Sequence, residues 1–185
     1  AGCTTRAWTR FTCACAAGYS GDGVTCTVCH QIQPGNLGTP ESYSGGYEIT
    51  GVREIYGPFE GPLTGPMVNF VNYTPVYSPH VNTSELCATC HTLMTPTLDA
   101  AGNIIGEFPE QTPYIEWKNS FYGQQGHVSC QDCHMRVAEQ AQDISLLPPF
   151  HQVLRAPYFQ HIFVGANVTM LEMLRDHATQ LGVTA

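Results

Sequence analysis

The chain has 185 residues, and its 15 acidic residues against 7 Lys and Arg give a formal net charge of −8. This length suits one domain, over residues 1–185. The few, scattered cations exclude a nucleic-acid-binding surface. Charged residues make up 12% of the chain, about half of the usual roughly 25%. No apolar run reaches the roughly 18 residues that a membrane-spanning helix needs, so no membrane span is predicted.

Residues 1–20 form an N-terminal segment with three cysteines, Cys3, Cys13 and Cys15. We expect a disulfide from Cys3 to either Cys13 or Cys15. The remaining thiol is then left for burial, for pairing with another chain, or for pairing with a part of the protein outside this sequence. Disulfides are typical of an oxidising compartment.

One five-residue pattern, Cys-x-x-Cys-His, occurs at residues 26–30, 87–91 and 130–134. This is the c-type haem attachment pattern. Two thiols three positions apart can form thioethers with one porphyrin, and the next imidazole can bind its iron. The sequence therefore predicts three covalently attached haem c groups. The thioether residues are Cys26, Cys29, Cys87, Cys90, Cys130 and Cys133, and the proximal iron ligands are His30, His91 and His134.

Two other kinds of site also use Cys-x-x-Cys. Structural zinc sites pair two such units, but a histidine directly after each unit is not part of their pattern. Thioredoxin-like redox motifs occur singly, near a βαβ pattern. Three copies followed by histidine favour haem over both.

Residues 34–66 form a Gly- and Pro-rich loop in which we expect no regular element. Interleaved aromatic and aliphatic residues favour an ordered loop on a porphyrin face over disorder. A small hairpin of residues 47–50 and 52–55 across Gly51 is one option. The following segment, residues 68–81, is β-prone but contains Pro75 and Pro79.

Further local elements are predicted along the second half. Ser84 is a plausible cap for a short helix that leads into the second motif. Residues 95–106 are typical of a hairpin with a turn at Asp99 to Asn103. Residues 114–121 suit a helix in which Trp117 and Phe121 stack at i,i+4. The clearest helix is C-terminal, over residues 166–182, with a capping box from Thr169 to Glu172 and a stop at Gly182.

Five histidines lie outside the attachment motifs, and an iron held by two imidazoles needs one of them per haem. We expect His80 and His161 to be distal ligands, with His127 or His151 completing the set. His177 falls on the apolar face of the C-terminal helix, where a core role is the stronger interpretation. Met67, Met94 and Met135 more often fill core gaps than bind iron.

Several stretches resemble the multihaem c-type cytochromes of bacteria and archaea, a group that includes nitrite reductases, hydroxylamine-oxidising enzymes and electron carriers. The stretches are residues 107–111, 114–117, 129–135 and 161–167. The last of these is similar to the segment that delivers a distal haem ligand. The chain departs from the enzymes because it has three motifs and no Cys-x-x-Cys-Lys.

We therefore expect a mainly irregular fold with short α-helices and minimal β-structure, organised around packed haems. The favoured function is electron transfer along three low-spin bis-histidine haems, rather than catalysis. The alternative is an oxidoreductase acting on a nitrogen or sulfur oxyanion at one five-coordinate haem. The expected partners are redox proteins or other cytochromes. A homopolymer, as in an extracellular conductive filament, is a third option. Because haem c is attached outside the cytoplasm, we expect a periplasmic or extracellular location and an export signal upstream of Ala1.

Overall fold

The computed structural model describes residues 25–144 and 153–163, together with residues 165, 172, 175–177 and 179. Short helices alternate with three two-stranded sheets in this part of the chain. Cys3, Cys13, Cys15 and His151 lie outside the described residues, and so does most of the predicted helix over 166–182.

The helices are short, and three of them carry the cysteine motifs. Their bounds are α1 Cys26–Cys29, η1 Pro40–Ser42, α2 Thr64–Val71, η2 Pro79–Asn82, α3 Ser84–Ala88, α4 Pro113–Asn119, η3 Tyr122–Gly126 and α5 Cys130–His134. Within the described ranges, no helix combines the length and the apolar character needed to cross a bilayer.

Each sheet joins only two strands. Strand β1 (Glu54–Gly57) pairs in parallel with β2 (Thr74–Tyr77). Strand β3 (Leu93–Leu98) pairs antiparallel with β4 (Ile104–Gln111), and β5 (Gln142–Asp143) pairs antiparallel with β6 (Leu154–Arg155).

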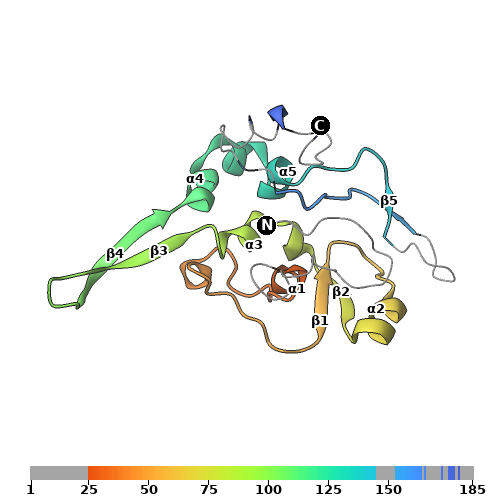
Figure 1. Ribbon diagram of the computed structural model, residues 1–185, viewed down its shortest axis with the longest axis horizontal. Helices are drawn as coiled ribbons and strands as arrows, with labels where there is room; N and C mark the ends of the chain where they lie inside the picture. Colours follow the sequence, from red (N-terminus) through yellow and green to blue (C-terminus); the bar gives the residue numbers. More distant parts are fainter. Residues whose placement is uncertain are drawn as a thin grey trace.

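The β3–β4 hairpin confirms the hairpin predicted over residues 95–106, and its strands extend further on both sides. Its tip is held by Asp99, whose Oδ1 accepts hydrogen bonds from the backbone N–H groups of Ala101 and Asn103, both at 2.8 Å. We call this hairpin, from Leu93 to Gln111, the arm. It projects away from the helices toward one end of the molecule (Figure 1).

The hairpin proposed across Gly51 is wrong, and so is the expectation of no regular element in residues 34–66. Strand β1 begins only at Glu54, and its partner is the distant β2. Helix α2 supplies the crossover that a parallel pair requires. This helix also occupies the start of the segment 68–81, whose β-prone residues become strand only from Thr74.

The predicted helix after Thr112 is confirmed as α4, but its aromatic pairing is different. Trp117 stacks on Tyr114, with ring centroids 5.6 Å apart, whereas Phe121 contacts the ring of Tyr122 edge-on. The helix ends at Asn119, and Ser120 has an extended backbone. The i,i+4 geometry that would bring Phe121 over Trp117 is therefore lost.

The buried apolar core of the described residues is small and lies close to the motifs. It consists of Ile32, Tyr56, Val81, Ala88 and Tyr114. Helices α1, α3 and α5 lie in the middle of the molecule, between the arm on one side and the β1–β2 and β5–β6 pairs on the other (Figure 1). The core therefore coincides with the region where the three cysteine motifs lie.

Candidate functional site

Each Cys-x-x-Cys-His motif occupies a helical turn. In the first, the N–H of His30 donates to the carbonyl of Cys26 at 3.0 Å, and in the second, the N–H of His91 donates to that of Cys87 at 2.9 Å. The third motif forms the whole of α5. An i to i+4 hydrogen bond places the histidine one turn below the first cysteine. Both cysteines and the histidine can then approach one flat ligand.

Helix α5 begins with a capping box that the sequence analysis missed. The Ser129 hydroxyl accepts from the N–H of Asp132 at 3.2 Å, and the Asp132 carboxylate accepts from the N–H of Ser129 at 2.7 Å. The sequence signal is a serine followed three residues later by an acidic residue, with aspartate in place of the usual glutamate. The box fixes the start of the third motif.

Ser84 joins the second and third motifs instead of capping α3. The N-cap residue of α3 is Thr83, and no side chain caps this helix. The Ser84 hydroxyl accepts a hydrogen bond from the N–H of Cys130 at 2.9 Å. The buried Gln131 adds a second link, since its amide donates to the carbonyls of Val81 and Thr83 at 3.3 and 2.8 Å. Two adjacent residues thus attach α5 to the segment that leads into α3.

Thiols of the three motifs shift one another's pKa values. A hydrogen bond between Cys87 and Cys130 raises the pKa of the Cys87 thiol and lowers the pKa of Cys130 to about 6. Burial, followed by the charge of Cys90, raises the pKa of Cys29. These interactions mean that the three motifs lie close together, and the second motif takes part in both of them.

The first motif faces a second imidazole. The ring centroids of His30 and His161 are 5.9 Å apart, with an angle of 40° between the ring planes. Nδ1 of His30 donates to the carbonyl of Tyr56 at 2.6 Å. The ring of His161 donates to the carbonyl of Phe159. Each imidazole therefore keeps one nitrogen that is not committed to a backbone carbonyl.

The distance between these two rings is compatible with two ligands on one metal. Imidazole nitrogen binds a transition metal at about 2 Å, so imidazoles on opposite sides of one iron have centroids about 6 Å apart. Histidine ligands commonly donate their other N–H to a carbonyl or carboxylate, which fixes the tautomer. His161 is exposed as a residue. The protein atoms around its ring, and then the charge of His30, lower its pKa.

His80 has a different environment, although it also lies near His30. The residue is buried, and its Nε2 lies 2.9 Å from the carbonyl of Ile32, which can only accept. Nδ1 therefore accepts from the hydroxyl of Ser78, at 2.6 Å. Burial is the main cause that lowers the pKa of His80. Iron ligation through Nε2 would require this nitrogen to leave the Ile32 carbonyl.

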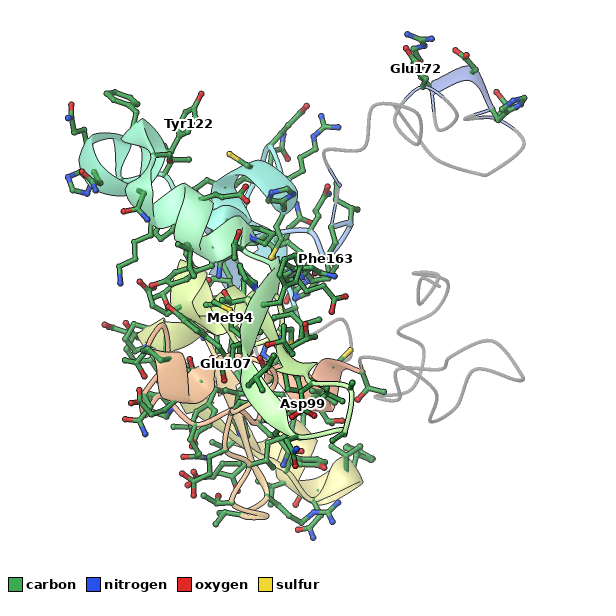
Figure 2. All side chains as sticks on the ribbon, turned by 90° about the vertical axis from the view of Figure 1, so that its left-hand side faces the viewer. Met94, Asp99, Glu107, Tyr122, Phe163 and Glu172 are labelled. Carbon is green, nitrogen blue, oxygen red and sulfur yellow. The ribbon has the colours of Figure 1, made fainter. Side chains whose placement is uncertain are left out.

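Among the other predicted ligands that the structure describes, none makes a ring contact with this pair. His91 and His134 are exposed at the ends of their motifs. His127 is exposed after η3, with a left-handed backbone (φ 49°). Figure 2 shows the neighbouring Tyr122 at an outer edge of the molecule, in the same region as η3. The structure thus brings together His30, His80 and His161 among the predicted histidines.

The residues present fit a c-type haem. Within the described residues, no disulfide joins the motif cysteines to one another. Beside the second motif, the buried hydroxyl of Thr92 has no hydrogen-bond partner within the described residues. A hydroxyl can donate to a carboxylate such as a haem propionate. No group of three or more His, Cys, Asp or Glu in the described ranges is arranged to hold a bare metal ion.

Comparison with family models, with characterised proteins and with solved structures gave no match to this chain.

Proposed function

We propose that this chain is a trihaem c-type cytochrome that transfers single electrons. The observation that carries the proposal is the facing pair His30 and His161 beside the first of three repeated attachment motifs. One member of the pair directly follows Cys29, and the other comes from a segment more than a hundred residues later in the chain. Two such imidazoles could both bind one iron, and that iron would then have no open position for a substrate.

The chain's own residues have separate roles in this proposal. The six motif cysteines would hold the porphyrins, and His30, His91 and His134 would bind the irons. The Tyr56 and Phe159 carbonyls accept from the rings of His30 and His161, and they would thereby orient these rings and increase the basicity of the other ring nitrogen of each. When bound, haem supplies the one-electron couple, while the protein sets its potential through ligands and burial.

The second and third sites are less complete in the described residues. His80, His127 and His151 remain the candidates for their distal ligands. The location proposed for the protein is outside the cytoplasm, where haem c is attached, and the proposed partners are other redox proteins.

Haem stoichiometry tests the proposal directly. The holoprotein should retain three haems in intact mass after denaturation and acid-acetone extraction, because thioethers survive both. The double variant Cys26→Ser/Cys29→Ser should retain two. A matched control in the first turn of the same motif, Thr27→Ser, should retain three. Haem that extracts freely, or a wild-type count of two or fewer, would contradict the proposal.

A further inference from the structure

The arm exposes apolar side chains that nothing in the described residues covers. All residues of β4 are exposed, and Ile104 and Ile105 at the tip are 70% and 69% exposed. Leu98 and Phe108 are also exposed. Met94, Glu107 and Asp99 follow one another along the arm toward its tip in Figure 2. Contiguous exposed apolar surface commonly marks an interaction site.

The arm is well formed despite this exposure. An isolated two-stranded hairpin is marginally stable in water, yet Asp99 makes three hydrogen bonds at the tip, two to backbone N–H groups and one to the side chain of Asn103. Pro96 in β3 and Pro109 in β4 lack the N–H group that strand addition uses. Contact through the side-chain faces is therefore favoured over pairing along the edges.

The arm is also acidic. Residues 93–111 contain three carboxylates, Asp99, Glu107 and Glu110, and no Lys or Arg. Glu107 pairs with Pro96 across the hairpin, and Leu98 pairs with Ile104, so Glu107 shares a face with apolar side chains near the tip. Neither glutamate forms an ion pair within the described residues. A surface that covers the arm should therefore be apolar and carry a cation.

A surface of this kind is present around the C-terminal end of α2. We call it the α2 face, and it comprises Arg53, its chain neighbour Val52, and Val68, which precedes Asn72 by one helical turn. Val52 and Val68 are exposed by 56% and 40%. The Arg53 side chain donates to the carbonyl of Asn72 at 2.9 Å and lies over the ring of Tyr73. No carboxylate of the described residues lies within ion-pair distance of its guanidinium.

The arm and the α2 face lie toward opposite ends of the longest axis of the molecule (Figure 1). We propose that the arm of one copy docks on the α2 face of a second copy. The aliphatic tip then packs on Val52 and Val68, while Glu107 approaches Arg53. The contact joins two different surfaces, so repetition produces an open chain of copies unless the rotation closes a ring.

A symmetric arm-to-arm contact is less favourable. It would bring two groups of three carboxylates together without a cation, and like charges at an interface cost free energy. The α2 face instead offers Arg53 to the acidic arm. The proposed contact involves neither a motif cysteine nor a histidine, so it is independent of haem binding and of electron transfer.

Mixing variants tests the contact. The arm variant is Ile104→Ser/Ile105→Ser, and the α2 variant is Val52→Ser/Val68→Ser. Each variant is made in the full chain and measured as purified, with its bound haem retained. Sedimentation velocity should show concentration-dependent association of the wild type at micromolar concentration, and monomers for each variant alone. An equimolar mixture should form dimers and nothing larger, because one intact arm and one intact α2 face remain. The control Phe121→Ser/Tyr122→Ser, at the exposed η3 end, should associate like the wild type.

Several outcomes would overturn the proposal: a monomeric wild type, a mixture that stays monomeric while circular dichroism shows both variants folded, or a control that also fails to associate. A charge exchange gives a second measurement. Glu107→Arg and Arg53→Glu should each weaken association about tenfold, and the double variant should recover it. If the double variant is weaker than either single variant, the Glu107–Arg53 approach is wrong. Haem content, measured by absorbance, should be equal in all variants. A failure of the docking proposal can therefore be distinguished from a failure of the cytochrome proposal.

Discussion

At the scale of single residues, the histidines around the first motif differ in what their ring nitrogens bind. His30 and His161 each donate to one backbone carbonyl and keep a second nitrogen. His80 commits both nitrogens, to Ile32 and Ser78. A metal ligand needs a free lone pair, so the first two are better prepared to bind iron than His80.

Replacement of His161 tests this distinction. His161→Ala should convert one of three haems from low to high spin, because its iron loses the sixth ligand. Electron paramagnetic resonance and the visible spectrum would record the change. His177→Ala, a change to an exposed histidine outside the pair, is the control and should leave all haems low-spin. A wholly low-spin spectrum in His161→Ala would remove His161 from the ligand set.

Tyr114 should control the alkaline stability of the fold. The residue is buried, and burial followed by the charge of Glu85 raises its pKa from 10.0 to about 12. The unfolded state releases the phenol proton more readily, so this stabilisation is complete below pH 10 and is lost as the pH rises through about 12. Tyr114→Phe should flatten the fall in unfolding free energy over this window, as measured by urea titration.

The control for this measurement is Tyr122→Phe, at an exposed tyrosine. It should leave the alkaline profile unchanged. Tyr43 and Tyr56 also have raised pKa values, both mainly through burial, so part of the slope should persist in Tyr114→Phe. If the pH profile of Tyr114→Phe is identical to that of the wild type, the raised pKa of Tyr114 does not contribute to the alkaline loss of stability.

At the scale of elements, the hydrogen bond from Cys130 to Ser84 makes α3 and α5 one unit. Ser84→Ala removes the acceptor of a half-buried N–H group at the start of α5, and we expect a loss of about 1–2 kcal/mol in unfolding free energy. Chemical denaturation would measure it. The hydroxyl of Ser120 donates only to the nearby carbonyl of Trp117, so the control Ser120→Ala should cost about 0.5 kcal/mol or less. Equal losses would argue against a special link between the motifs.

The elements that the sequence predicted well are those with local causes. The helical turns of the motifs follow from i to i+4 bonds, and the arm follows from the turn held by Asp99. The errors have non-local causes: β1 pairs with β2 across α2, and Ser84 binds Cys130 from another helix. A hydroxyl that binds a distant N–H group leaves no periodic signal in the sequence. The facing of His30 and His161 is of this kind too, since only the folded chain brings them within 5.9 Å.

At the scale of the whole molecule, the second motif occupies the middle position. Its Cys87 shares a hydrogen bond with Cys130 of the third motif, and the charge of its Cys90 raises the pKa of Cys29 in the first motif. Helix α3 accordingly lies between α1 and α5 (Figure 1). In the proposed cytochrome, electrons that cross the molecule would pass through the group held at α3.

This central position predicts an asymmetry between motif variants. Oxidised and reduced haems differ by one charge, and the interaction between charges falls with distance. Loss of the central attachment, in Cys87→Ser/Cys90→Ser, should therefore shift the midpoint potentials of both remaining haems. Loss of the first attachment, in Cys26→Ser/Cys29→Ser, should shift the potential of the central haem and leave that of the third nearly unchanged.

Spectroelectrochemical titration of the two variants beside the wild type would measure these shifts. Because every proposed ligand is a histidine nitrogen and none is methionine, all midpoint potentials should also lie below those of cytochromes with Met/His ligation. Variants that retain two haems and the wild-type circular dichroism spectrum are required for the comparison, since Cys87 contacts Cys130 directly. Equal shifts of the third haem in both variants would mean that the first and third groups are neighbours, and the order deduced from the interactions between thiols would be wrong.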